Sequence, residues 1–425
     1  MRRTSALWEV FVLRFEEAME RYRKRRLTAE EAGELLGLSG RHFRRLLVRY
    51  EDEGVVGLRD RRLGKVSPRR APAAELRRMQ MLYQERYRDF TVKHFHEQLV
   101  KRHHYKLSYT VTRLALQSAG LVAPHKRRGG THRKRRERRP LPGMLLFQDG
   151  SSHRWIGALD HDLDLIVTLD DATGAIYSAF LIEEEGTMSS FRGLCETIAA
   201  HGLFRSFYTD RGSHYFHTPK AKGPVDKSRL TQIGRALSQL GINHIPSYSP
   251  EARGRMERVF GTIKNRLPPE LRVAEIATVE AANRYLTQVF VPDYNARFAV
   301  PAAEQGSAFI PYAGRPLADI LCVQESRQVG RDNCVLWKGL SLQIPPQRHR
   351  HHYVKASVRV HEYPDGLLAI FDGPSCLARF TADGKPIDVP RAALTPLGGP
   401  GLMDLWTMLR VAHNPTGPAT TAADI

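Results

Sequence analysis

Apolar residues recur along the chain with different periods in different regions. Between residues 28 and 122 they recur at helical spacing, and between 144 and 266 short apolar runs alternate with helical stretches. Beyond about residue 321 apolar and polar residues alternate, which is typical of strands with one buried face. These patterns predict a multidomain chain with an all-α N-terminal part, a central α/β domain and a C-terminal β-rich part.

Residues 28–50 have the pattern of a helix-turn-helix. Thr28 and Glu31 are spaced as a capping box, and Gly37 ends the first helix. Phe43 and Leu46 form the inner side of a second helix. Its outer side carries Arg41, His42, Arg44, Arg45 and Arg49. This row of cations favours contact with DNA phosphates and guanine edges, and a solvated surface helix is the alternative interpretation.

The net charge of +20 lies in the first third of the chain. Residues 1–140 hold 36 Lys and Arg against 16 Asp and Glu, and the remainder holds 29 of each. This predicts a polyanion-binding arm joined to a separate working domain. No run of about 18 apolar residues occurs, which disfavours a membrane partner. Four widely spaced cysteines fit a reducing compartment, so we expect a cytoplasmic protein.

Two basic stretches without apolar periodicity are predicted to lie along DNA. The first, residues 57–70, contains Arg61 and Arg62. The second, Lys126–Arg139, has nine Lys or Arg in fourteen residues, and such a run repels itself and extends. Both would add salt-dependent affinity that does not depend on base sequence. The contacts predicted in the second stretch are Lys126, Arg127, Arg128, Arg133, Lys134, Arg135 and Arg136.

The centre of the chain alternates strands and helices in a recognisable order. A strand ends near Asp149, a hairpin and a helix follow, a short strand leads into Asp210, and a later helix carries Glu257. Strand, hairpin, helix, strand, helix, strand, helix is the order of a ribonuclease H-like α/β domain. The predicted strands are 144–150, 163–169, 175–182, 204–208 and 243–248, and the predicted helices are 189–200, 231–240 and 252–266.

Three short motifs in this domain resemble the acidic motifs of the DDE integrase core. They are Phe147-Gln148-Asp149, Tyr208-Thr209-Asp210-Arg211-Gly212-Ser213 and the ten residues from Ser249 to Arg258. With the helix-turn-helix arm, the chain resembles a DDE-type insertion-sequence transposase that has a retroviral-integrase-like catalytic core, nearest in character to the ISNCY group. The resemblance covers about residues 140–300.

The resemblance implies a metal-dependent polynucleotidyl transferase. Asp149 would bridge two Mg²⁺ or Mn²⁺ ions, and Asp210 and Glu257 would each bind one. Two ions about 3.5–4 Å apart activate the attacking group and stabilise the leaving oxygen of a phosphodiester. The implied partners are double-stranded DNA (transposon ends and target DNA) and further copies of the chain, as a homo-oligomer in the synaptic complex. The resemblance also implies a bacterial protein that is associated with the nucleoid.

Glu257 is chosen over Glu251 because of its helix position. Gly254 and Gly261 flank Glu257 on one side of the predicted helix and leave room for metal and phosphate. Glu251 lies at the proline-marked start of the helix, where an interaction with the macrodipole is the simpler role. Asp170 and Asp171 are interpreted as turn residues of the hairpin. The DNA contacts predicted on this helix are Arg253, Arg255, Arg258 and Lys264.

A second helical unit over about 72–122 contains four histidines: His94, His96, His103 and His104. Integrases of the retroviral type have a His/Cys zinc domain here, but this chain has no cysteine before Cys195. We therefore interpret the histidines as structural or DNA-facing. The last helix of this unit, after Ser108, resembles another helix-turn-helix.

The C-terminal strands suggest a small β-barrel comparable to the SH3-like end of integrases. The expected domains are 1–66 (helix-turn-helix), 67–140 (second helical unit and basic linker), 141–300 (catalytic core), 301–390 (β-rich) and 391–425 (tail). Two alternatives remain for function. One is a catalytically silent DNA-binding regulator that retains the fold, and the other is a ribonuclease H-like nuclease.

Overall fold

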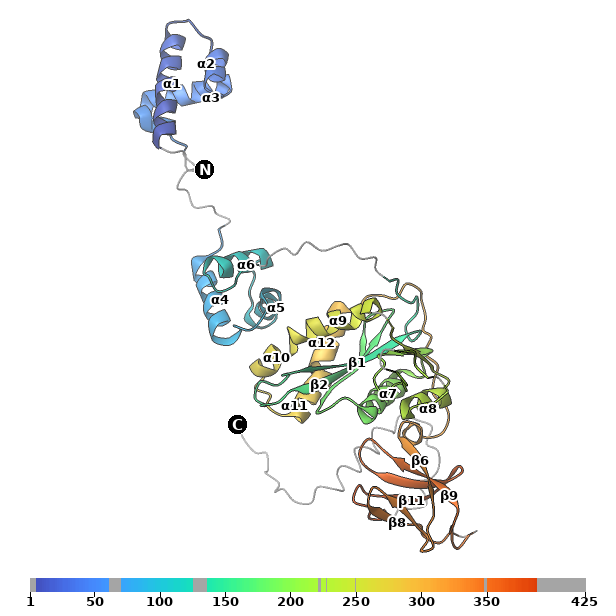
Figure 1. Cartoon of the computed structure of the whole chain (residues 1–425). Helices are drawn as coiled ribbons and strands as arrows, with labels where there is room; N and C mark the ends of the chain where they lie inside the picture. The colour runs from blue at the N-terminus through green and yellow to red at the C-terminus, as the bar shows by residue number, and fades with distance from the viewer. Residues whose placement is uncertain are drawn as a thin grey trace. The chain divides into compact units, whose positions relative to one another are not determined.

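A computed structural model describes residues 5–60, 70–124, 136–220, 223–226, 228–248, 250–347 and 350–387, with the side chains of 5–6 and 250–253 left out. The chain divides into two compact units, Met1–Arg77 and Arg78–Ile425. Figure 1 gives the labels of the helices and strands. We describe each unit by itself.

Residues 5–60 of the first unit fold into three helices and a short 3-10 turn. They are α1 (Ser5–Arg23), α2 (Ala29–Leu35), α3 (Gly40–Glu53) and η1 (Gly54–Leu58). The capping box of Thr28 and Glu31 is present as predicted, and Ser39 caps α3. A Cβ on Gly33 would lie 2.7 Å from the carbonyl oxygen of Leu38, so only glycine permits this close approach of α2 to the following turn.

The core of this unit joins the two predicted helices to a helix that was not predicted. Phe15 of α1 is fully buried, and its ring lies 5.7 Å from that of Phe43 on α3. Ala32 and Leu46 are buried in the same cluster. The aromatic side chains of α1 therefore cover the apolar side that α2 and α3 share.

A three-helix segment of the second unit packs on the helices of the α/β domain. It consists of α4 (Ala73–Arg86), which begins in the first unit, α5 (Val92–His103) and α6 (Tyr109–Ser118). The Glu97 carboxylate accepts hydrogen bonds from Arg266 at 2.8 Å and from Arg297 at 2.5 Å. Arg272 pairs with Asp89 in the same way. These contacts fix α5 and the α4–α5 connection against residues 266–297.

Three of the four histidines of this segment have partners within the fold. His94 is fully buried, and its Nε2 lies 2.7 Å from a carboxylate oxygen of Glu270. The Nε2 of His96 lies 3.0 Å from the carbonyl oxygen of Leu107, and that of His103 lies 3.0 Å from the hydroxyl of Tyr87. These contacts support the structural interpretation of the histidines.

The α/β domain is built on a five-stranded mixed sheet. Its strands are β1 (Leu146–His153), β2 (Leu163–Asp170), β3 (Ile176–Ile182), β4 (Ser206–Thr209) and β5 (Asn243–Pro246). The spatial order is β3-β2-β1-β4-β5. β1 and β3 run antiparallel to β2, whereas β4 runs parallel to both β1 and β5. The element order predicted for the domain is confirmed.

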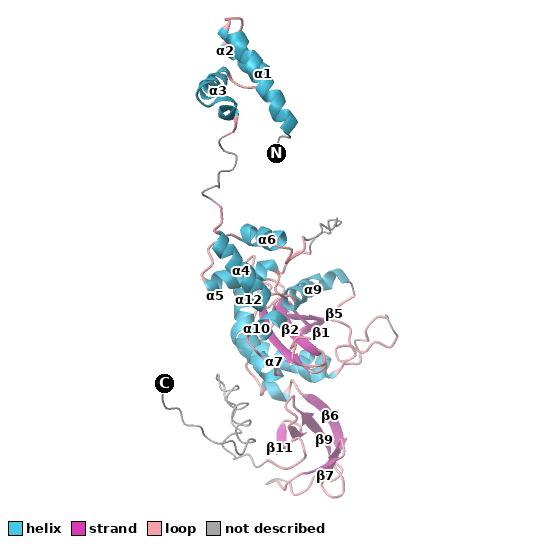
Figure 2. Ribbon diagram, turned by 90° about the vertical axis from the view of Figure 1, so that its left-hand side faces the viewer, coloured by secondary structure: helices cyan, strands magenta, loops and turns pink. Residues whose placement is uncertain are grey.

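Helices cover both faces of this sheet (Figures 1 and 2). α7 (Thr187–His201) and α8 (Gln232–Gln239) pack with Leu146 on one face. α9 (Pro250–Lys264) and α10 (Leu267–Val273) pack with Phe147 on the other. Because successive residues of a strand face opposite sides, β1 contributes to both cores in alternation.

One continuous helical stretch over 279–298 follows α10 and contains a π-helical turn. α11 (Val279–Tyr285) and α12 (Val291–Phe298) are joined by a π-helical turn, Leu286–Phe290. Asn295 accepts the backbone N–H of Ile176 at 2.8 Å and donates to the carbonyl oxygen of the same residue at 2.8 Å. Asn283 does the same for Leu181. The free edge of β3 is thus closed by two side-chain amides.

The C-terminal strands form two sheets. β6 (Val323–Gln328), β9 (Ser357–Glu362), β10 (Leu368–Asp372) and β11 (Ser375–Phe380) make a four-stranded sheet, and β7 (Cys334–Trp337) pairs with β8 (Leu340–Gln343). Val358 and Val360 point inward as predicted. These strands confirm that the C-terminal part is β-rich. Among the described residues the strand pairings close no barrel, so the comparison with the SH3-like end of integrases stays a prediction. The expected tail, 391–425, lies outside the described residues.

Candidate active site

Asp149 lies in the middle of β1, and Asp210 directly follows the end of β4, the parallel neighbour of β1. The sequence predicted that the first strand ends near Asp149, but β1 continues to His153 because it stays paired with β2 over its whole length. Phe147 of β1 is the register partner of Tyr208 of β4, and each aspartate follows two residues later, so the two aspartates occupy corresponding positions on adjacent segments. Both side chains are half-buried. The Asp210 carboxylate also accepts the backbone N–H of Gly212 at 2.8 Å, which orients it.

Asp149 points to the face of the sheet that α9 covers. Its neighbour Gln148 is turned to the other face, where it contacts the α7 side of the domain. Residues two apart on a strand share a face, so Asp149 lies on the same side as Phe147. Phe147 packs in the core that includes Met256 and Phe260 of α9. The first two predicted carboxylates and the helix that carries the third therefore share one side of the sheet.

A buried chain of hydrogen bonds supports β1 beneath the site. Gln148 donates to Thr168 and accepts the hydroxyl of Tyr215, both at 3.0 Å, and Ser190 donates to the same hydroxyl. Burial raises the pKa of Tyr215 well above its ordinary value, and the charges of Glu185, Asp210 and Asp149 also raise it. Tyr215 therefore stays protonated and donates its hydrogen bond close to three carboxylates.

Glu185 is a residue of this region that the sequence reasoning missed. Its carboxylate lies against Gly150, so closely that a Cβ at residue 150 would overlap it. Its Oε1 lies 3.6 Å from the Nε2 of His214, which follows Asp210 by four residues. Its position in the sequence could have identified it, because the acidic run Glu183–Glu185 directly follows the strand that ends at Ile182.

Glu257 is exposed on α9, and no three acidic, histidine or cysteine groups within the described ranges are placed to hold a metal ion. The buried stripe of α9 contains Met256, Phe260 and Ile263. A Cβ on Gly254 or Gly261 would meet nothing within 4 Å. The surface beside Glu257 is therefore open. The side chain of Glu251, the alternative, lies outside the described residues.

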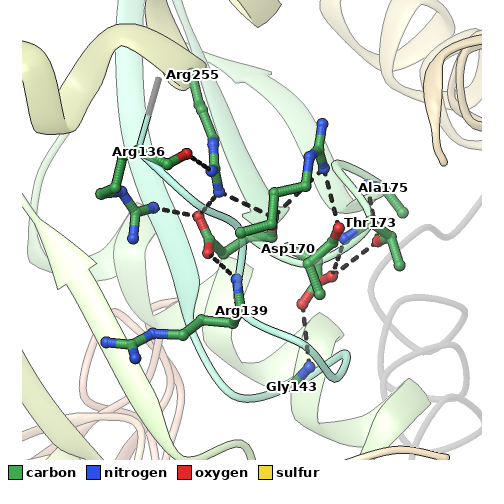
Figure 3. A network of polar contacts seen from close by, with 10 residues as sticks. Arg136, Arg139, Gly143, Asp170, Thr173, Ala175 and Arg255 are labelled. Carbon is green, nitrogen blue, oxygen red and sulfur yellow. Dashed lines mark hydrogen bonds and ion pairs between the residues drawn. The ribbon is translucent and has the colours of Figure 1, made fainter. Parts of the chain in front are cut away.

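Asp170 and Asp171 end the β2 strand and hold the turn, as predicted. Asp170 accepts the backbone N–H groups of Thr173 at 2.8 Å and Gly143 at 3.0 Å. Asp171 is fully buried and forms ion pairs with Arg136 and Arg255 (Figure 3). It also accepts the backbone N–H of Arg139 at 2.8 Å.

Arg136 and Arg255, both predicted DNA contacts, thus have a structural partner that the sequence did not reveal. The guanidinium of Arg255 also donates to the carbonyl oxygens of Asp171 at 3.0 Å and Arg136 at 2.8 Å. Its side chain is only 13% exposed. Burial lowers the pKa of Arg255, and the Asp171 carboxylate counteracts that shift.

The cations predicted on α3 are placed differently from one another. Arg41, Arg44 and Arg45 are exposed, while His42 is half-buried. Arg49 is also half-buried and donates to the carbonyl oxygen of Arg59 at 2.7 Å, so it is not part of the exposed row. The reason is tertiary, because η1 folds back on the end of α3.

The other predicted contacts are exposed, half-buried or outside the described part. Arg258 of α9 is exposed, and Lys264 is half-buried. The predicted contacts that fall outside the described residues or side chains are Arg61, Arg62, Lys126, Arg127, Arg128, Arg133, Lys134, Arg135 and Arg253. Their roles stay predictions.

The aspartate pair suits a hard divalent cation. Carboxylate oxygens are the ligands that Mg²⁺ prefers, and one or two carboxylates with water and phosphate oxygens usually complete its shell. Asp149 and Asp210 supply two such groups, from strands whose backbone is fixed by the sheet. Glu257 lies on the helix that packs over the same face, on an unobstructed surface.

The domain is thus an α/β fold with one aspartate within β1 and a second directly after the parallel strand β4. The chain is 32% identical over 348 residues to y4bF of Sinorhizobium fredii, provisionally named a transposase, covering 81% of this chain and 75% of that protein. It is 27% identical over 298 residues to the transposase of insertion sequence IS1202 from Streptococcus pneumoniae, covering 62% of this chain and 63% of that protein. The chain belongs to the insertion-sequence transposase family.

Two solved structures of retroviral integrases resemble parts of the chain weakly. The catalytic core domain of HTLV-2 integrase, solved in complex with magnesium, is 21% identical and covers 35% of this chain and 89% of that one, with a TM-score of 0.26. The intasome of simian T-cell lymphotropic virus is 15% identical and covers 74% and 100%, with a TM-score of 0.31. No protein-family model matches the chain. Within the described residues, no helix has the length and apolar content to span a membrane.

Proposed function

We propose that this transposase binds the ends of its element as double-stranded DNA and catalyses phosphodiester cleavage and strand transfer at Asp149, Asp210 and Glu257. The observation that supports the proposal is the register of β1 and β4, in which Phe147 pairs with Tyr208 and each predicted aspartate follows two residues later. In a transposase, two neighbouring carboxylates would serve to bind divalent metal ions. DNA cleavage and joining both require a negative phosphate to be attacked in line.

Bound divalent ions would activate the attacking water or 3′-hydroxyl and stabilise the leaving oxygen. The chain's own residues would position these reactants. Asp149 would hold the ions from within β1 and Asp210 from the residue after β4, with Gln148 and Tyr215 supporting β1 through their hydrogen bond. Glu257 would complete the ligand set from α9, whose exposed glycine-flanked surface leaves room for a DNA backbone.

DNA would reach this site through the basic first third of the chain. α2 and α3 would act as a helix-turn-helix, with the exposed arginines of α3 in the major groove. The basic linker around 126–135 would track phosphates and add affinity that falls with salt. Joining two element ends in one reaction requires at least two DNA-binding arms, so we expect a homo-oligomer during the reaction.

The test uses the full chain, duplexes that carry the DNA flanking its gene, and Mg²⁺ or Mn²⁺. Asp149→Ala and Glu257→Ala should abolish joining but leave binding of the duplex unchanged. Asp162→Ala removes an exposed carboxylate on the β1–β2 hairpin and serves as the matched control. Added Mg²⁺ should raise the unfolding temperature of the wild type and fail to do so for Asp149→Ala.

Three results would contradict the proposal. Undiminished joining by the alanine variants would remove these carboxylates from the chemistry. Duplex binding by a wild type that neither cuts nor joins would favour the silent regulator. Preferential cutting of RNA–DNA hybrids over duplex DNA would favour the nuclease.

A further inference from the structure

One apolar residue lies in the middle of the exposed basic face of α3. At 100° per residue, Arg41, Arg44, Arg45 and Val48 fall within an arc of about 100°. Phe43 and Leu46 point to the opposite side and are buried. Val48 sits near the centre of the outward arc, and its side chain is 55% exposed.

Val48 has no evident role in holding the first unit together. The core of this unit is made by Phe15, Phe43 and Leu46 with their neighbours, and Val48 is not among the residues packed against it. Single exposed apolar residues are common on protein surfaces and need no explanation by themselves. The distinguishing feature here is the surroundings, because arginines precede Val48 by three, four and seven residues on the same face.

The charge of this face changes sign just after Val48. The first turns carry Arg41, Arg44 and Arg45, whereas Asp52 is exposed on this face beyond Val48, and Glu51 beside it is exposed and pairs with Arg23 at 2.7 Å. Phosphates attract the former and repel the latter. A duplex would therefore meet the N-terminal turns of α3, and Val48 would be the last residue of the contacting surface.

The arginines are available for such contact. Arg44 forms an ion pair with Glu30 at 3.2 Å, but both side chains are more than half exposed, so the pair contributes little and is easily exchanged. An aliphatic side chain cannot pair with a phosphate or with a polar base edge. In the major groove its one favourable partner is the 5-methyl group of thymine.

We propose that Val48 determines base specificity by packing against the 5-methyl group of a thymine in the element-end DNA. The inference rests on the proposed function of α2 and α3 in DNA binding. It assigns sequence discrimination to an uncharged residue and leaves the arginines to supply phosphate contacts and guanine recognition.

The test exploits uracil, which pairs as thymine does but lacks the methyl group. Each thymine of the flanking duplex is replaced in turn by uracil, and binding is measured for the wild type, Val48→Ala and Leu13→Ala. Leu13 is 66% exposed on α1, on the side of that helix opposite the buried Phe15, and is the matched control. The wild type should lose about threefold to fivefold in affinity at one or two positions, which corresponds to one buried methyl group.

Val48→Ala should bind the thymine duplex correspondingly more weakly and show no loss with uracil at those positions. Leu13→Ala should behave as the wild type. If Val48→Ala keeps the same sensitivity to uracil, or if the wild type shows none, the proposal is wrong while DNA binding by α3 stands. If the wild type does not prefer the flanking duplex over unrelated DNA, the proposed function itself fails.

Discussion

Replacing Asp171 by asparagine should destabilise the α/β domain more than almost any other polar substitution. The Asp171 carboxylate is fully buried and pairs with Arg136 and Arg255 (Figure 3). It also accepts the backbone N–H of Arg139, so it connects three segments: the end of the linker, the turn after β2 and the first half of α9. Asparagine has nearly the same shape but no charge.

The magnitude follows from how much of each arginine is in water. Removing one partner from a buried ion pair costs about 3–5 kcal/mol, because the other charge is left without compensation. Arg255 is 13% exposed and cannot recover its hydration, whereas Arg136 is 41% exposed and can turn outward. We therefore expect about 3 kcal/mol for Asp171→Asn, and about 1 kcal/mol or less for Arg136→Met.

The assay is calorimetric unfolding of the full chain, in which the α/β domain should give its own transition. For a domain of this size, 1 kcal/mol lowers the midpoint by about 2–4 °C, so Asp171→Asn should lower it by about 6–12 °C. Asp160→Asn is the control, because the Asp160 side chain is fully exposed on the neighbouring hairpin and should give no measurable shift. A midpoint for Asp171→Asn within 2 °C of the wild type would refute the reasoning.

Three further substitutions should separate structural from functional roles. Gly261→Ala should raise the free energy of unfolding by about 0.5–1 kcal/mol, measured by thermal unfolding, because alanine favours a helix over glycine and no atom lies within 4 Å of the added Cβ. The same Cβ should slow DNA joining, because it narrows the space left for DNA beside Glu257. Faster joining would contradict this prediction. Burial lowers the pKa of His361 to about 3. Below about pH 6.5 the unfolded chain takes up a proton on this side chain and the folded chain does not, so stability falls as the pH falls toward 3. At pH 5 the free energy of unfolding should be about 2 kcal/mol lower than at pH 8. Neither ring nitrogen has a hydrogen-bond partner among the described residues, so His361→Leu should reduce the drop in unfolding temperature between pH 8 and pH 5, and an unchanged drop would count against it. Asn295→Ala should cost about 2 kcal/mol in urea unfolding by leaving both backbone groups of Ile176 without their partner, and a loss below 0.5 kcal/mol would show that water replaces the amide.

Much of the α/β fold could be predicted from local sequence. The strands and most helices of this domain were expected within a few residues, because short apolar runs bounded by turn residues have few other uses. The strand end before Asp210 was expected for the same reason, whereas the strand predicted to end near Asp149 continues to His153. The capping box at Thr28 was also visible, since it depends only on residues three apart.

Partners that are distant in sequence could not be predicted. Arg255 was expected to contact DNA, but Asp171, 84 positions earlier, holds it. Glu185 gave no signal beyond its place after a strand, although its carboxylate lies beside Gly150. The two side-chain amides that close β3 were not recognised either, because an edge strand is defined by what does not pair with it.

The sequence by itself determined most of the elements, though not α1, together with the division into a basic arm and a neutral working part and the three acidic motifs, because each of these depends on neighbours along the chain. Only the tertiary structure decided which charges face outward. A guanidinium is drawn inward wherever folding leaves a carboxylate buried beside it, as with Arg255 and Asp171. It stays in water where the nearest acid is itself exposed, as with Arg44 and Glu30. That choice depends on burial, and burial is a property of the whole fold.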